Sequence, residues 1–196
     1  CGELGIKYLT IYAFSTENWN RPPSEVEGLM NLLVDTITSE VEELHKNGVK
    51  MSSVGDPSLL PLNCQESLRK MEEITKNNDT IHLQIALNYS ARWDIITTVK
   101  NISKDVKRGL LSADDIDENI INQYSCFAGI PDPELLIRTS GECRISNFML
   151  WQLAYTELYF TEVLWPDFRK DHLYQAVLDY QSRERRFGKI SEQLED

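Results

Sequence analysis

Apolar residues in this chain gather in short runs separated by stretches of helical character. The short runs are rich in β-branched and aromatic residues and predict buried strands at residues 6–14, 49–54 and 81–87. Helices are expected at residues 24–48, 57–77, 92–107, 112–124 and 173–187. Strands that alternate with helices in this way predict a single α/β domain over residues 1–196, with a largely parallel sheet and helices on both faces.

The helix predicted at residues 24–48 has a continuous apolar face. Ser24 is expected to cap it and Gly48 to end it, which gives a length of about 35 Å at 1.5 Å per residue. The face consists of Val26, Leu29, Met30, Leu33, Ile37, Val41 and Leu44. Such a face is interpreted first as part of the core. A second interpretation is the wall of a groove for an extended apolar ligand.

Residues 134–168 are the most informative stretch. A buried strand at residues 135–137 ends on Arg138, a polar loop follows, and a helix is predicted to open at Ser146. A second apolar and aromatic run lies at residues 158–160. Because ligands of parallel sheets bind at the carboxyl ends of the strands, Arg138 is a candidate binding residue.

Arg138, Arg144 and Ser146 together predict an anion site. Two guanidinium groups, a hydroxyl and a helix amino terminus form a good receptor for a phosphate group. Taken singly, each residue has a plainer interpretation, as an arginine in a surface ion pair or a serine that caps a helix. Their combination in a loop with little other charge favours the phosphate receptor.

A second polar cluster follows the strand predicted at residues 6–14. It comprises Ser15, Thr16, Glu17, Asn18, Trp19, Asn20 and Arg21. The cluster again lies at the carboxyl end of a strand, and Pro22-Pro23 ends the loop. Two strand ends therefore carry candidate chemistry.

Composition excludes several classes of partner. A hydrophobic content of 41% is enough for one good core. The net charge of −11 argues against nucleic acid or an anionic membrane surface as the main partner. A polyanionic substrate would have to be held by a few local arginines against this overall charge.

The four cysteines predict an intracellular protein. Cys1, Cys64, Cys126 and Cys143 show no paired spacing, which fits reduced thiols better than a disulfide framework. No run is long and apolar enough to span a membrane. Cytoplasm, endoplasmic reticulum surface and plastid all remain open. Because the sequence opens on Cys1 with no initiator Met, we expect an amino-terminally truncated form.

Common catalytic motifs are absent. The sequence contains no GxGxxG, GxxxxGK[ST], HExxH or GxSxG. Its histidines, His45, His82 and His172, are dispersed, and each is interpreted as structural rather than as a metal ligand.

Three long segments resemble the cis-prenyltransferases, the family of undecaprenyl and dehydrodolichyl diphosphate synthases. They are AFSTENWNRPPSEV from Ala13, LNYSARWDI from Leu87 and LLIRTSGECRISNFMLWQLAYTELYFTEVLWPDF from Leu135. The ending RERRFG from Arg183 fits the same pattern. The resemblance covers essentially the whole chain, and the motif sequences are most similar to those of plant members.

The resemblance implies an enzyme that adds isopentenyl diphosphate to an allylic diphosphate primer, with a new cis double bond at each step. The product would be a cis-polyprenyl or short-chain cis-prenyl diphosphate, which can partition to a membrane. Mg²⁺ is the implied cofactor, and a homodimer is the implied assembly, with a heteromer containing a related subunit as the alternative.

The resemblance also assigns roles to residues. Asn18 is the implied proton-relay position, and Glu157 is the implied magnesium-linked carboxylate. The implied substrate-binding set is Ser15, Thr16, Glu17, Trp19, Arg21, Glu25, Arg138, Arg144, Ile145 and Ser146. Plainer interpretations are a turn-former for Asn18, an edge-strand charge for Glu157 and core packing for Trp19.

Two departures from the family pattern leave other functions open. The family's amino-terminal strand and phosphate loop precede the first residue here, so we expect this exact chain to fold poorly alone and to have little condensation activity. Cys143 stands where many bacterial members carry His, and a soft thiol is a poor ligand for Mg²⁺. The rival hypotheses are a non-catalytic partner subunit and, less economically, a carrier of apolar ligands.

Overall fold

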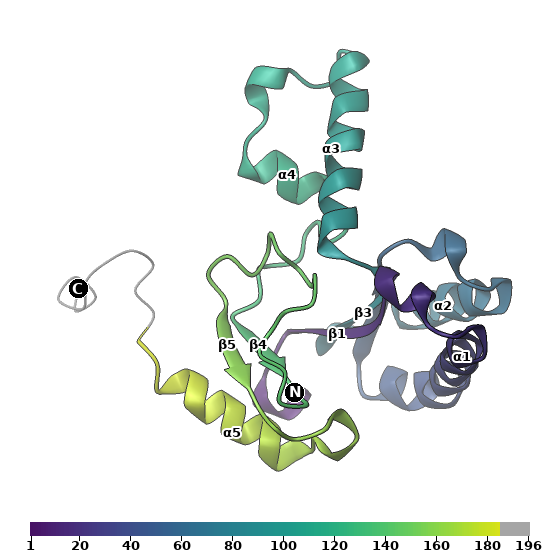
Figure 1. Cartoon of the computed structure of the whole chain (residues 1–196), viewed down its shortest axis with the longest axis vertical. Helices are drawn as coiled ribbons and strands as arrows, with labels where there is room; N and C mark the ends of the chain where they lie inside the picture. Colours follow the sequence, from purple (N-terminus) through teal and green to yellow (C-terminus); the bar gives the residue numbers. More distant parts are fainter. Residues whose placement is uncertain (185–196) are drawn as a thin grey trace. The chain divides into compact units, whose positions relative to one another are not determined.

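The computed structural model describes residues 1–184. The chain divides into two compact units, Cys1–Ile130 and Pro131–Asp196, which are described separately below. Figure 1 shows the elements of both units in sequence colours. Every strand pairing is parallel, which confirms the predicted α/β class.

A three-stranded parallel sheet forms the centre of the first unit. It consists of β1 (Tyr8–Ser15), β2 (Val49–Val54) and β3 (Ile81–Tyr89), in the order β1-β3-β2. The register pairs Ser15 with Tyr89 and Val54 with Ala86. The carboxyl ends of all three strands therefore lie at one edge of the sheet.

Burial differs strongly between these strands. The middle strand β3 is buried without interruption from Gln84 to Tyr89. In β1 only Phe14 is buried, so the prediction of a buried strand at residues 6–14 is wrong for most of its length. The reason is topological, because among the described residues β1 pairs on one side only, and β-branched content does not show which strand is central.

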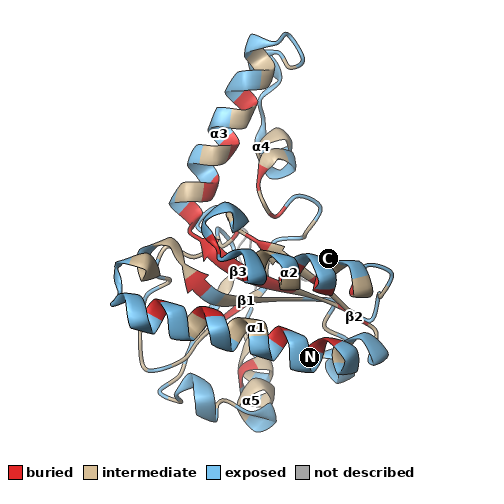
Figure 2. Ribbon diagram, turned by 90° about the vertical axis from the view of Figure 1, so that its right-hand side faces the viewer, coloured by how far each residue is buried: buried red, intermediate tan, exposed pale blue. Residues whose placement is uncertain are grey.

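Helices α1 (Pro23–Lys46) and α2 (Leu62–Thr75) pack against each other and against β2. Val26, Met30, Ile37 and Val41 of α1 are buried. Figure 2 shows buried segments recurring along α1 between exposed ones. The core interpretation of this face is therefore confirmed. Ser24 is not the cap, since the helix begins one residue earlier with a proline at its first position, where proline's fixed φ suits a helix and no N–H is needed.

Helices α3 (Ala91–Lys107) and α4 (Glu118–Tyr124) complete the first unit. The Ser90 side chain caps α3 and the Asp117 side chain caps α4. The two helices are joined by the Tyr124 hydroxyl, which donates to Asp105 Oδ2 at 2.7 Å, and Figure 1 shows them side by side. Short 3-10 turns of this unit lie at Gly2–Leu4, Thr16–Asn20, Pro57–Leu59 and Ala113–Asp115. A further 3-10 turn, Trp165–Asp167, belongs to the second unit.

The second unit contains the parallel pair β4 (Leu135–Arg138) and β5 (Glu157–Phe160), followed by α5 (Lys170–Gln181). Arg138 is the last residue of β4, as expected. Of the basic cluster expected in the last helix, Arg183 follows the end of α5, and Arg185 and Arg186 lie outside the described residues.

The helix predicted to open at Ser146 is absent from the described structure. Residues 139–156 form turns and bends. Ser146, Asn147 and Met149 have φ values of 49°, 60° and 49°. Left-handed backbone at three of four successive residues cannot continue a right-handed helix, so the apolar spacing of this segment was misleading.

No helix within residues 1–184 has the length and apolar character needed to cross a membrane.

Candidate functional site

The turn that follows β1 carries the first group of candidate residues. It is a 3-10 turn at Thr16–Asn20, directly after Ser15 at the carboxyl end of the strand. Asn18 closes the turn, because its Oδ1 accepts a hydrogen bond from the Ser15 backbone N–H at 2.9 Å. Its backbone carbonyl accepts from the Arg21 N–H at 3.0 Å. Asn18 therefore does act as a turn-former. This role uses the side-chain oxygen Oδ1 as an acceptor and does not use the Nδ2 donor.

Trp19 is half-buried in the same turn. Its ring lies edge-on to Phe14, with 5.2 Å between the ring centroids. Its indole Nε1–H donates to Asn88 Oδ1 at 2.8 Å. The contacts with Phe14 and Asn88 thus support the core-packing interpretation of Trp19.

Arg21 and Glu25 form an ion pair at the start of α1. Arg21 Nη1 lies 2.8 Å from Glu25 Oε1, and both side chains are about half exposed. An exposed pair of this kind contributes little to stability, roughly 0–1 kcal/mol. Its clearer effect is to hold the guanidinium beside the turn that contains Asn18.

Tyr12 lies next to this turn, and sequence reasoning did not single it out. Burial and the nearby Glu17 carboxylate raise the pKa of Tyr12 to about 12. Its hydroxyl donates to the Tyr89 carbonyl at 3.0 Å. Tyr12 is therefore a neutral hydrogen-bond donor at neutral pH and ties β1 to the end of β3.

Arg138 ends β4 in the second unit, at the position where a parallel pair of strands presents ligands. Its Nε atom is buried, yet it has no hydrogen-bond partner among the described residues. A buried donor of a charged group is expensive to leave unpaired. An anion that reached Arg138 would supply the missing acceptor.

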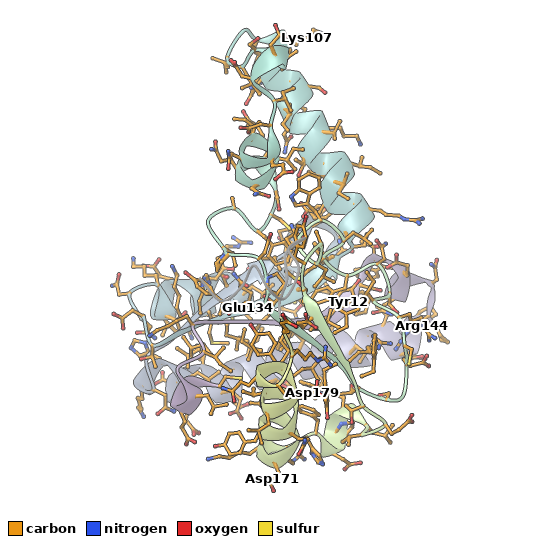
Figure 3. All side chains as sticks on the ribbon, turned by 90° about the vertical axis from the view of Figure 1, so that its left-hand side faces the viewer. Tyr12, Lys107, Glu134, Arg144, Asp171 and Asp179 are labelled. Carbon is orange, nitrogen blue, oxygen red and sulfur yellow. The ribbon has the colours of Figure 1, made fainter. Side chains whose placement is uncertain are left out.

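The loop after β4 holds Arg144, Ile145 and Ser146. Arg144 is exposed, forms an ion pair with Glu142, and is labelled on this loop in Figure 3. Ser146 is exposed and Ile145 is half-buried. Because no helix begins at Ser146, the helix dipole that was expected to assist anion binding is not available there. Anion binding at this loop would rest on the two guanidinium groups and the hydroxyl.

Glu157 opens β5 and is already paired. The Arg183 guanidinium Nη1 donates to Glu157 Oε2 at 2.8 Å, and this contact raises the pKa of Arg183. The strand register places Glu157 opposite Leu135 and Phe160 opposite Arg138. Glu157 and Arg138 therefore lie at opposite ends of the strand pair, about 10 Å apart along the strand axis.

The described residues do not fit a magnesium centre built by the protein alone. Within residues 1–184 there is no group of three or more His, Cys, Asp or Glu side chains placed to hold a metal ion. Mg²⁺ demands near-ideal octahedral geometry with oxygen ligands. A single carboxylate engaged by a guanidinium does not provide that.

The structure groups the predicted residues in two sets. Ser15 to Arg21 and Glu25 are gathered in the first unit, and Arg138, Arg144 to Ser146 and Glu157 belong to the second. Sequence reasoning missed Asn88 as the partner of Trp19. The available signal was an Asn directly at the end of a buried strand, a residue that tolerates left-handed backbone.

A family model matches residues 1–188, and its description is putative undecaprenyl diphosphate synthase. An isoprenyl transferase of Geobacillus kaustophilus is 51% identical, with 96% of this chain and 74% of that protein covered. The ditrans,polycis-undecaprenyl-diphosphate synthase of Pasteurella multocida is 46% identical, with 97% and 79% covered.

Solved structures agree with the sequence relatives. Lavandulyl diphosphate synthase from Lavandula x intermedia, in complex with dimethylallyl diphosphate, has a TM-score of 0.94 at 41% identity, with 96% of this chain and 81% of that chain covered. A probable undecaprenyl diphosphate synthase from Campylobacter jejuni has a TM-score of 0.86 at 33% identity, with 96% and 86% covered. Since both bacterial sequence relatives are more identical than the lavender enzyme, these values do not favour a particular likeness to plant members. The chain belongs to the undecaprenyl diphosphate synthase family of cis-prenyltransferases.

Proposed function

We propose that this protein condenses isopentenyl diphosphate with an allylic prenyl diphosphate and releases a longer cis-prenyl diphosphate. The observation that carries the proposal most directly is the buried, unpartnered Nε of Arg138 at the end of β4, within residues 1–184. Diphosphate oxygens are suitable acceptors for such a donor, and a guanidinium binds them in a fixed geometry.

The reaction fixes what the site must do. The C1–O bond of the allylic substrate breaks and the electron pair leaves with its diphosphate. The terminal double bond of isopentenyl diphosphate forms the new bond to that carbon. One proton is then lost from C2 of the isopentenyl unit, and a new double bond remains. The protein must bind two diphosphates, exclude water from the allylic cation and direct this proton.

Arg138, Arg144 and Ser146 are proposed to bind the diphosphate of isopentenyl diphosphate. Arg138 supplies an unpaired buried donor, whereas Arg144 Nη1 forms an ion pair with Glu142, whose carboxylate competes with the ligand for this guanidinium. The half-buried Ile145 is proposed to contact the substrate from the same loop.

Asn18 is proposed to orient the proton's route. A neutral amide is not a strong base, so the acceptor of the proton would be diphosphate or water. Its Oδ1 is engaged with the Ser15 N–H, which leaves the Nδ2 donor as the group to hold that acceptor. Ser15, Thr16, Glu17, Trp19 and Arg21 are proposed to line the same loop, with Glu25 orienting Arg21 through their ion pair.

Mg²⁺ dependence is part of the proposal, with the ion bound mainly by the substrate. Mg²⁺ is commonly held by one or two carboxylates together with substrate phosphates. The ion would neutralise diphosphate charge. Glu157 would contribute through a carboxylate whose Oε2 is already engaged by Arg183.

A homodimer is the proposed assembly, and light scattering on the purified protein tests it. The rival hypothesis of a non-catalytic partner subunit makes a different prediction, namely no activity alone and activation of a second prenyltransferase subunit. The chain retains Asn18 and Arg21 of the first motif and both arginines of the second, Arg138 and Arg144. Their presence favours the catalytic hypothesis.

Incorporation of radiolabelled isopentenyl diphosphate into butanol-extractable product tests the function. Dimethylallyl, geranyl and farnesyl diphosphate are offered in turn, with and without Mg²⁺, and product masses are measured. We expect product masses that differ from the primer by whole five-carbon units. The alternative result is a folded protein that gives no extended product with any primer but increases the activity of a second synthase. That result would establish the non-catalytic partner subunit instead.

A further inference from the structure

We infer that Asn88 is a positioning residue for the proposed reaction and that it acts through Trp19 to hold the turn at Thr16–Asn20 in place. The inference rests on the proposed function, because the turn that Asn88 holds carries Asn18, which is proposed to orient the route of the proton. Every contact that it uses lies within the first unit.

Asn88 uses both ends of its side-chain amide to join separate parts of the chain. Its Oδ1 accepts from Trp19 Nε1 at 2.8 Å, and its Nδ2 donates to the Asp56 carbonyl at 2.8 Å. Its own backbone carbonyl accepts from the Asp56 N–H at 3.3 Å. One residue at the end of the central strand thus connects the turn after β1 with the turn after β2.

The backbone at Asn88 supports this role. Its φ is 46°, in the left-handed region that few residues other than Gly, Asn and Asp adopt readily. The residue is 2% exposed, so the Asn88 end of each of its two part-buried amide contacts is shielded from solvent. A buried polar network of this kind rigidifies its surroundings when every member is satisfied.

The turn after β2 is equally constrained. Gly55 has a φ of 122°, and a Cβ atom at this position would collide with the Leu87 carbonyl oxygen. The Gly55–Asp56 turn therefore lies close against the end of β3, which gives Asn88 a fixed carbonyl to bind. The indole of Trp19 is then held from two sides, by Phe14 through its ring and by Asn88 through its N–H.

The consequence concerns the adjacent residue. Asn18 precedes Trp19 directly, so the position of the indole restricts where the Asn18 amide can point. The side-chain contact of Asn18 itself is local, because its Oδ1 accepts from the N–H of Ser15, only three residues away. The Trp19–Asn88 bond adds a direct side-chain link from the turn to the central strand, between residues 69 positions apart in sequence.

Asn88→Gly is the direct test, since glycine accepts the left-handed backbone and removes both amide contacts. We expect kcat for isopentenyl incorporation to fall about 10- to 100-fold, the range that small misplacements near reacting groups produce. Asn78→Gly is the matched control. Asn78 donates to the Val49 carbonyl at 2.8 Å, at the opposite edge of the same sheet. We expect it to lower the melting temperature without a comparable loss of kcat.

A double-mutant cycle separates positioning from stability. Trp19→Phe removes the indole donor and keeps an aromatic ring against Phe14. If Asn88 acts through Trp19, Asn88→Gly adds little further loss of kcat in the Trp19→Phe background. Losses that multiply in the double variant, or a folded Asn88→Gly protein with the wild-type kcat, would overturn the inference.

An NMR measurement tests the contact without activity. In protein labelled with ¹⁵N at the indole nitrogens, the Trp19 signal is assigned by its loss in Trp19→Phe. We expect slow hydrogen exchange of that proton in the wild type and fast exchange in Asn88→Gly. Fast exchange in the wild type would remove the physical basis of the inference. If the wild type shows slow exchange but no transferase activity, the proposed function fails while the contact stands.

Discussion

The Arg183 guanidinium holds the Glu157 carboxylate at 2.8 Å in the second unit. The same guanidinium also contacts the Leu158 carbonyl at 3.0 Å and the Asp179 carboxylate, which lies on α5 and is labelled in Figure 3. Both side chains of the Arg183–Glu157 pair are only about 30% exposed. The residue implied as a metal ligand is therefore also the anchor that ties the chain after α5 to β5.

This relationship predicts that Arg183 and Glu157 stabilise the protein jointly. Arg183→Gln and Glu157→Gln should each lower the free energy of unfolding by about 1 kcal/mol, and the double variant by less than the sum. Urea unfolding of the four proteins measures the coupling. Additive losses would show that the ion pair has no energetic role.

Arg138→Ala should weaken the binding of isopentenyl diphosphate by more than loss of an exposed ion pair would, on the order of 2–4 kcal/mol. The reason is that Arg138 presents a buried donor for which residues 1–184 provide no acceptor. The Michaelis constant for isopentenyl diphosphate measures this, with circular dichroism as the check on folding.

Arg108→Ala is the control for that experiment. Arg108 is exposed, directly follows α3 and lies 3.5 Å from Asp105 of that helix, so its removal should leave the Michaelis constant unchanged. Equal Michaelis constants in Arg138→Ala and the wild type would contradict the assignment of Arg138.

Glu142→Gln should strengthen the binding of isopentenyl diphosphate. Glu142 occupies Arg144 in the absence of ligand, so its neutralisation removes a competitor for the guanidinium. The gain is limited by the small energy of an exposed pair and should not exceed about five-fold in the Michaelis constant. Arg144→Ala should abolish the effect of Glu142→Gln, and a gain that persists in that background would have another cause.

Asn18→Asp separates two roles of one side chain. Aspartate keeps an oxygen to accept from the Ser15 N–H but lacks the Nδ2 donor. We expect a melting temperature near that of the wild type and a loss of kcat of roughly 100-fold, the lower end of what a positioned group contributes to proton transfer. Full activity of the Asp variant would reduce Asn18 to a turn-former.

His82 should make folding stability depend on pH. Burial and the nearby Lys50 lower the pKa of His82 below its ordinary value of 6.5. The unfolded chain then binds the proton more readily than the folded protein does. This contribution to stability is therefore complete above pH 6.5 and is lost as the pH falls toward the lowered pKa.

His82→Gln should remove that contribution. Melting temperatures between pH 7.5 and 5 should fall less steeply for the variant than for the wild type. Because Ser52 Oγ lies 2.8 Å from His82 Nε2, glutamine is chosen to retain a polar partner for it. Parallel curves for the two proteins would show that His82 is not the responsible group.

Local sequence determined the helices and strands of the first unit well. The strand predicted at residues 49–54 coincides with β2, and the helix predicted at residues 92–107 differs from α3 by one residue. These elements follow from properties that act over a few residues, such as apolar period, β-branched content and side-chain caps. The motifs that carried the family resemblance are also continuous in sequence, and the family is confirmed.

Tertiary structure decided the contacts between distant residues. The sequence contained Asn88, Glu142 and Arg183, but it did not show that they bind Trp19, Arg144 and Glu157. It also predicted a helix at Ser146, where consecutive left-handed residues produce turns. Local propensity cannot resolve either question, because both the partner of a buried amide and the path of a loop depend on what the rest of the chain places beside them.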